Sequence, residues 1–151
     1  MHGYLDSFPY IDVKTGRWPG RDYAWRIALL KQDPRAARKQ LATLRRNLKA
    51  AKPLLARARP RTARQRQRVA AWRWAYDALS YFAEVGEQLL IEPGEHDVKL
   101  LRRFRGRAVK LAQRTETLLG RIFTDWTMLD EQQTRWAVHV DWLDAMIAAA
   151  R

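Results

Sequence analysis

The sequence contains no cysteine, and this absence removes several chemistries at once. Disulfide bonds, thiolate metal sites and thiol nucleophiles are all excluded. A reducing cytoplasm is the simplest location for a chain without disulfides. We therefore expect a cytoplasmic protein, and we find no sequence pattern that calls for a metal or another cofactor.

Long apolar runs are also missing. The longest runs are only a few residues, whereas a membrane-spanning helix needs about 20. The opening residues MHGYLDSFPY lack the basic and apolar regions of a signal peptide. With 151 residues, 47% of them apolar, the chain is expected to be soluble, to have no membrane partner and to form one domain over residues 1–151.

The motifs of common catalytic sites are absent as well. There is no phosphate-binding glycine loop, no nucleophile elbow and no Glu-x-x-His pair of the kind that holds di-iron. Arg135 and His139 share a helical face and resemble the arginine–histidine motif of the HEPN ribonucleases, which are all-helical. Only three residues separate them, however, and Trp136 stands where that family has a polar residue. We expect a non-catalytic protein in which His139 is partly buried near Asp141 or Glu116.

Acidic residues are missing from one long part of the chain. The net charge is +13, and 22 of the 29 basic residues are arginine. No acid lies between Asp33 and Asp77, while residues 35–74 carry fourteen Lys or Arg. Residues 75–98 carry six acids and no Lys or Arg, and residues 99–114 carry seven Lys or Arg and no acid. A surface charged only for solubility would mix the signs, so these blocks indicate a basic surface with an anionic partner.

Apolar spacing after residue 20 predicts an all-α protein. Short connections between successive helices favour an antiparallel bundle of four long helices. The helices are expected to begin at the Asp33-Pro34 cap, at a Thr62–Gln65 capping box, near Asp97 and near Thr127, with connections over 58–61, 93–96 and 124–127.

Prolines and glycines set the remaining limits. Pro53 should kink the first long helix or make it restart near Lys52. Residues 1–21 contain several prolines and glycines among aromatic residues, so we expect an irregular or hairpin segment that packs along the bundle as a strap. A short helix is expected over about residues 22–31.

The apolar seams of the helices assign the core. Leu44, Trp72 and Trp136 lie on these seams, and replacing Leu44 or Trp72 with alanine is expected to cost about 2–5 kcal/mol. Trp18 and Trp74 lie close to arginines instead, so they are the tryptophans predicted to stack on bases.

Folding these helices should gather cations at one end of the bundle. Residues 57–68, RARPRTARQRQR, carry six arginines and no acid, and they connect the first two long helices. More cations follow one face of the third helix. Arginine binds phosphate in a bidentate manner, which favours contact with a polyanion. The predicted contact residues are Arg45, Lys49, Lys52, Arg57, Arg59, Arg61, Arg64, Arg66, Arg68, Arg73, Arg103, Arg107, Lys110 and Arg114.

Part of the charge is expected to be balanced inside the bundle. A hairpin about residue 93 would bring Glu84 and Glu87 level with Lys99, Arg102 and Arg103. A hairpin about residue 60 would instead place the cations from Arg45 to Arg57 beside those from Arg61 to Arg73. The hairpin about residue 60 therefore predicts that one end of the bundle is strongly positive.

The function that fits these features is non-catalytic binding of nucleic acid through its phosphates. No recognition-helix or zinc-finger pattern indicates strong sequence specificity. The alternative is a protein-interaction module, such as an adaptor or inhibitor, that docks its basic surface on an acidic protein. The sequence leaves open DNA or RNA, one strand or two, and the oligomeric state.

Overall fold

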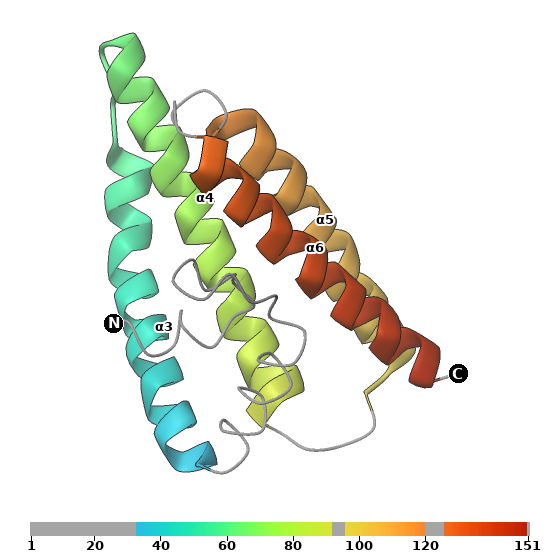
Figure 1. Cartoon of the computed structure of the whole chain (residues 1–151). Helices are drawn as coiled ribbons and strands as arrows, with labels where there is room; N and C mark the ends of the chain where they lie inside the picture. The colour runs from blue at the N-terminus through green and yellow to red at the C-terminus, as the bar shows by residue number, and fades with distance from the viewer. Residues whose placement is uncertain (1–32, 92–95, 120–125, 151) are drawn as a thin grey trace.

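The computed structural model describes residues 33–91, 96–119 and 126–150, and within these ranges it contains four helices and no strand. The helices are α3 (Pro34–Arg57), α4 (Ala63–Val85), α5 (Val98–Leu119) and α6 (Trp126–Ala149), and α4 continues as a π-helix, η1 (Gly86–Ile91). Successive helices run in opposite directions (Figure 1). The predicted all-α class with four long helices is confirmed. The predicted helix over 22–31 and the segment over 1–21 lie outside the described residues.

The helix starts follow the caps that the sequence predicts. The Asp33 carboxylate accepts a hydrogen bond from the Ala36 amide at 2.9 Å. At the start of α4, the Thr62 hydroxyl accepts from the Gln65 amide at 3.2 Å, and the Gln65 side chain accepts from the Thr62 amide at 3.2 Å. This reciprocal pair is the predicted capping box. Each cap satisfies amide groups that have no partner inside the helix.

The predicted restart at Pro53 does not occur, since α3 is one continuous helix. A proline in a helix removes the hydrogen bond to the carbonyl four residues earlier, which here is that of Lys49. Lys49, Lys52 and Pro53 are all exposed, so water can satisfy that carbonyl. The helix therefore tolerates the proline on its solvent side.

The main core lies between α4, α5 and α6. Phe104 and Tyr81 are fully buried at its centre, and Trp136 is 3% exposed. Apolar spacing in the sequence predicts that the buried face of α5 carries Leu101, Phe104, Ala108, Leu111, Thr115, Leu118 and Ile122. The first five are buried, Leu118 is half-buried, and Ile122 lies outside the described residues. The buried residues of this core are Ala78, Tyr81, Val85, Leu89, Leu101, Phe104, Ala108, Leu111, Trp136, Leu143 and Ile147.

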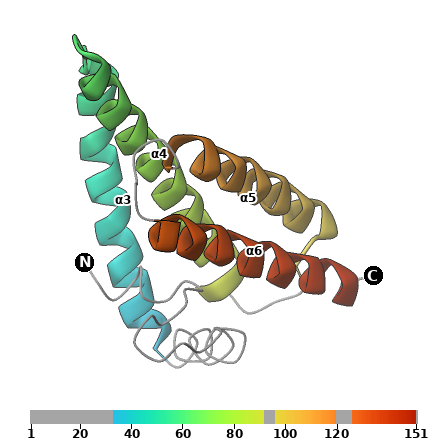
Figure 2. The same ribbon diagram turned by 45° about the horizontal axis from the view of Figure 1, so that its top comes forward.

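Helix α3 attaches through a narrower seam. Ala37 and Leu41 pack against Ala83 of α4, and Leu44 and Leu48 lie half-buried beside them. Helix α4 thus lies between α3 on one side and the α5–α6 pair on the other (Figure 2). Leu44 contacts this cluster, as the sequence predicts. The expected cost of Leu44→Ala, about 2–5 kcal/mol in the free energy of unfolding, stays a prediction.

The turn between α3 and α4 projects beyond α5 and α6 in both ribbon views (Figures 1 and 2). Near this turn, Trp72 is 67% exposed and Leu54 is 70% exposed. The prediction that Trp72 belongs to the core is therefore wrong. Its spacing continues the apolar seam of α4, but its own face of the helix is open to solvent, whereas Trp74, two residues further on, donates to the Leu111 carbonyl of α5.

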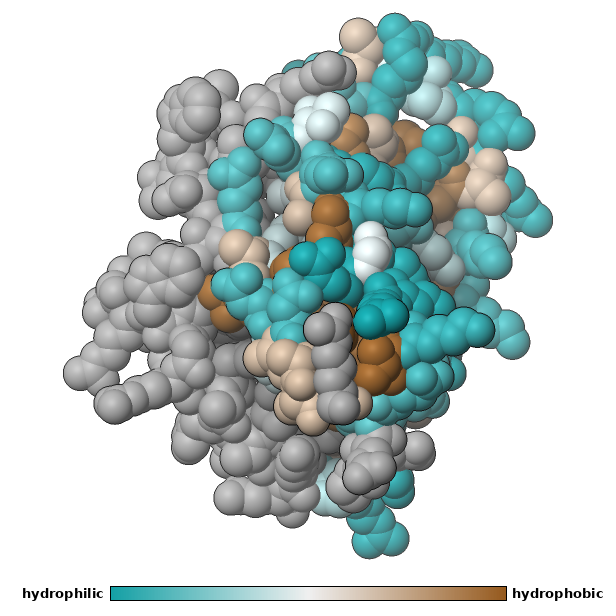
Figure 3. All heavy atoms as spheres, turned by 90° about the vertical axis from the view of Figure 1, so that its right-hand side faces the viewer, coloured by the Kyte–Doolittle hydropathy of each residue, from teal (hydrophilic) through white to brown (hydrophobic). Residues whose placement is uncertain are grey.

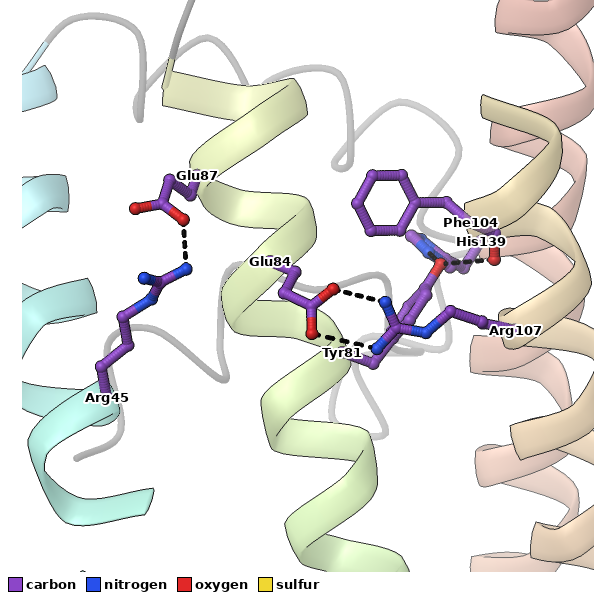
Figure 4. A network of polar contacts seen from close by, with 7 residues as sticks. All are labelled: Arg45, Tyr81, Glu84, Glu87, Phe104, Arg107 and His139. Carbon is purple, nitrogen blue, oxygen red and sulfur yellow. Dashed lines mark hydrogen bonds and ion pairs between the residues drawn. The ribbon is translucent and has the colours of Figure 1, made fainter. Parts of the chain in front are cut away.

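Buried polar groups lie at the centre of the core, and they were not predicted as a pair. The Tyr81 hydroxyl lies 2.7 Å from Nε2 of His139 and 3.3 Å from the Phe104 carbonyl oxygen (Figure 4). His139 is 1% exposed, so it is fully rather than partly buried, and its side-chain partner is Tyr81 rather than Asp141 or Glu116. Burial lowers the pKa of His139 to about 3 and raises the pKa of Tyr81.

Hydrophilic residues cover most of the described surface on the side of the molecule seen in Figure 3, with small hydrophobic areas between them. None of the four described helices is long and apolar enough to cross a membrane.

Candidate functional site

Two ion pairs join α4 to α5 across their antiparallel contact. Asp77 pairs with Arg114 at 2.7 Å, and Glu84 accepts two hydrogen bonds from Arg107 (Figure 4). The acids are seven residues apart on α4 and the arginines are seven apart on α5, so each pair is two helical turns from the other. We call this set the ion-pair ladder. It uses cations that sequence analysis assigned to a polyanion.

The predicted partners of Glu84 and Glu87 are wrong. Glu84 pairs with Arg107, one turn further along α5 than Arg103, and Glu87 pairs with Arg45 of α3 (Figure 4). Both ion pairs between α4 and α5 are centred between residues 95 and 96 in the sequence, rather than at residue 93 as predicted. Helix spacing identifies the faces that carry charge, but the length of the connection sets which charges meet.

Arg45 is consequently not part of the positive end. It lies twelve residues before Arg57, so the two are about 18 Å apart along α3. Its ion pair with Glu87 holds α3 against the far end of α4. Arg107 is also occupied, because its guanidinium lies over the Tyr81 ring at 5.3 Å while it pairs with Glu84. The hydrogen bond to Glu84 raises the pKa of Arg107.

The ladder ends at Asp77, since no acid lies between Asp77 and Asp33. Beyond it, an open groove of about 610 Å³ lies between α4 and α5. Its cations are Arg73, Lys110 and Arg114, and of these only Arg114 has an acidic partner within the described ranges. The remaining lining residues are Ala70, Gln113, Thr117 and Leu118. The groove is therefore basic, and Arg73 and Lys110 have no acidic partner among the described residues.

The basic arm, residues 52–73, lies next to this groove and carries eight Lys or Arg and no acid. Every residue from Arg61 to Arg68 is exposed. Arg59 donates to the Ala56 carbonyl at 2.9 Å, which is a local contact at the end of α3. Arg73 of α4 donates to the Leu55 carbonyl of α3 at 3.4 Å, and this bond joins the two helices of the arm. No acid within the described residues pairs with any cation of the arm.

The remaining predicted contact residues are dispersed. Lys49 is exposed on α3, three residues before the arm begins. Arg103 is exposed on α5, and its guanidinium lies 5.5 Å from the centre of the Phe104 ring. The structure therefore brings together the arm and groove cations, but not Arg45, Arg103 or Arg107.

The tryptophans predicted to stack on bases do not gain support. Trp74 is partly buried, packs against the main core and donates its indole N–H to the Leu111 carbonyl at 3.5 Å. Trp18 lies outside the described residues. Trp72, which sequence analysis assigned to the core, is the exposed tryptophan of the arm.

His139 is enclosed by Tyr81, Phe82, Trp136 and Trp142, so its ring does not face solvent. Tyr81 was not among the predicted core residues, although it lies three residues after Ala78 and four before Val85, on the same buried face. Within the described ranges, no group of three or more His, Asp or Glu side chains could hold a metal ion.

Comparison of the chain with protein-family models, with curated proteins and with solved structures finds no match.

Proposed function

We propose that this protein binds nucleic acid without catalysis, through phosphates that contact the basic arm and the adjoining groove. The observation that carries the proposal is the arm itself, which has eight cations and no acid. It consists of the end of α3, the start of α4 and the turn between them, and this turn projects from the bundle (Figure 2). Like charges held this close oppose the compact state, and an anionic partner removes that cost.

No acid among the described residues pairs with a cation of the arm. The acids nearest to the arm on α4 are Asp77 and Glu84, and each is already paired with an arginine of α5. Four arginines of the arm, Arg57, Arg61, Arg64 and Arg68, have no side-chain hydrogen bond or ion pair with the described residues. A guanidinium in this state is ready to bind a phosphate with two parallel hydrogen bonds.

An acidic protein is the alternative partner. The exposed side chains of Trp72 and Leu54 favour it, because tryptophan and arginine together are the residues that dominate many protein interfaces. A measurement at physiological salt separates the two functions. Only the first one requires that the protein bind nucleic acid under that condition.

Replacing Arg61, Arg64, Arg66 and Arg68 with glutamine is expected to weaken binding to DNA and RNA by at least about tenfold at 0.1 M salt. The slope of log affinity against log salt should become shallower by up to about 0.9 per lost contact on duplex DNA, or about 0.7 on a single strand. The capping box at Thr62 and Gln65 is retained, so the fold should not suffer. Fluorescence anisotropy with labelled oligonucleotides over a salt series measures both quantities.

The matched control replaces Arg35, Arg38, Lys99 and Arg102 with glutamine. These residues are exposed, lie far along the chain from the arm and carry the same total charge. The control variant should keep at least most of the wild-type affinity. An equal loss in both variants would mean that binding follows net charge rather than the arm. Weak binding by the wild type, with loss of an acidic protein partner in the arm variant, would favour the alternative function.

A further inference from the structure

Trp72 is an exposed aromatic residue in a cationic setting. Its side chain is 67% exposed, and within the described part of the chain no other ring or cation is stacked on the indole. Single exposed apolar side chains are common on protein surfaces, so it is the setting of the indole among arginines that points to a ligand. A flat aromatic ring beside cations is suited to stacking on a base. The ring is therefore available to a flat ligand.

Two arginines share the face of α4 on which Trp72 lies. Arg64, Arg68 and Trp72 follow one another at intervals of four residues, and all three are exposed. Residues four apart on a helix are neighbours on one face, with a rise of about 6 Å between them. We call these three residues the α4 stripe. It presents two guanidinium groups and then an indole in a line.

Unpaired nucleotides carry the chemistry that fits this line. Successive phosphates along a strand can meet Arg64 and Arg68, while a base stacks on the indole of Trp72. Duplex DNA keeps its base faces covered by neighbouring bases, so it offers the stripe its phosphates but no ring face. An acidic peptide would satisfy the arginines but would leave the indole without a planar partner.

Resting on the proposed function, we infer that the α4 stripe binds single-stranded nucleic acid, with Trp72 stacked on an unpaired base and Arg64 and Arg68 on the adjoining phosphates. The wild-type protein should then prefer a single strand with bases to a strand of the same length that lacks them. A duplex offers no unpaired base, so stacking on Trp72 should add nothing to the affinity of the wild-type protein for duplex DNA.

The test compares three probes: a poly-dT strand, an abasic strand of equal length and charge, and a duplex. Trp72→Ala should lower affinity for poly-dT about 5- to 150-fold, as loss of one stacking residue does. Its affinity for the abasic strand and the duplex should stay within about twofold of wild type, since no phosphate contact is removed. Trp72→Phe should recover part of the poly-dT affinity, because phenylalanine also stacks.

Leu54→Ala is the matched control, since it removes the other strongly exposed large apolar side chain of the arm. It should leave all three affinities unchanged. The double variant that carries Arg64→Gln and Arg68→Gln should lose affinity for all three probes by a similar factor.

If Trp72→Ala binds poly-dT as wild type does while the double arginine variant is weakened, the stacking inference is overturned and the proposed function stands. If the wild type binds none of the probes at physiological salt, the proposed function fails, and the stripe is left to a protein partner.

Discussion

Replacing Phe104 with alanine is expected to lower the free energy of unfolding by about 3–5 kcal/mol. The Phe104 ring is fully buried and packs edge-to-face on Tyr81, with ring centres 5.9 Å apart. Its backbone carbonyl also lies 3.3 Å from the Tyr81 hydroxyl. Removing the ring leaves a cavity where α4 and α5 meet, and closely packed helices relax only in part to fill it. Urea unfolding followed by circular dichroism measures the change.

The matched substitution is Trp72→Ala, which removes an even larger side chain. Because Trp72 is 67% exposed, this change should alter the free energy of unfolding by less than about 1 kcal/mol. A loss as large as that of Phe104→Ala would mean that the indole is covered in solution. That result would contradict both the exposure of Trp72 and its proposed role in stacking.

The comparison of these two aromatic residues shows what apolar spacing can predict. On α5 the seam from Leu101 to Thr115 was predicted correctly, because α5 has a neighbour along all of that length. On α4 the same reasoning placed Trp72 in the core, although its side chain is 67% exposed while Trp74, two residues further on, contacts α5. Spacing gives the direction in which a side chain points. Whether another helix lies in that direction depends on how the helices are arranged.

The candidate site was predictable to a similar extent. The absence of acids between Asp33 and Asp77 predicted a cationic surface at the α3–α4 turn, and the arginines from Arg57 to Arg68 are exposed there. The loss of Arg45, Arg107 and Arg114 to ion pairs was not predicted, since pairing depends on the register between helices. The matching seven-residue spacings of Asp77 with Glu84 and of Arg107 with Arg114 were a signal that the sequence did contain.

The ion-pair ladder and the basic arm together account for the block pattern of charge. Acids lie on α4 where α5 is alongside, and there they pair with its arginines. Beyond Asp77 the acids stop and the groove opens, with Arg73 and Lys110 on its two walls. Among the described residues, the positive charge without an acidic partner is therefore concentrated in the basic arm and along the α4–α5 groove.

Acid is expected to destabilise the protein through His139. The ring is 1% exposed, its Nδ1 has no hydrogen-bond partner, and burial lowers the pKa of His139 to about 3. The described groups that face it are the Tyr81 hydroxyl and aromatic rings, and the Glu84–Arg107 ion pair lies against Tyr81. No carboxylate among the described residues is hydrogen-bonded to the imidazole, so nothing offsets the cost of burying its charged form.

The direction of the pH effect follows from the two pKa values. In the unfolded chain the pKa of this histidine returns to about 6.5. Between pH 6.5 and about 3, the unfolded chain therefore binds more protons than the native protein, so stability falls as the pH falls. At about pH 4.5, two units below the unfolded pKa, the loss due to His139 is about 2–3 kcal/mol. It increases to about 4 kcal/mol near pH 3.

His139→Phe removes this titration and keeps an aromatic ring in the same space. In this variant the Tyr81 hydroxyl retains the Phe104 carbonyl as a partner. Between pH 7 and about pH 4.5, the wild type should lose about 2–3 kcal/mol more stability than the variant, measured by urea unfolding at each pH. Tyr81→Phe keeps the histidine and should keep the acid loss. If the wild type and His139→Phe lose stability equally, the imidazole is not held buried and neutral in the native state.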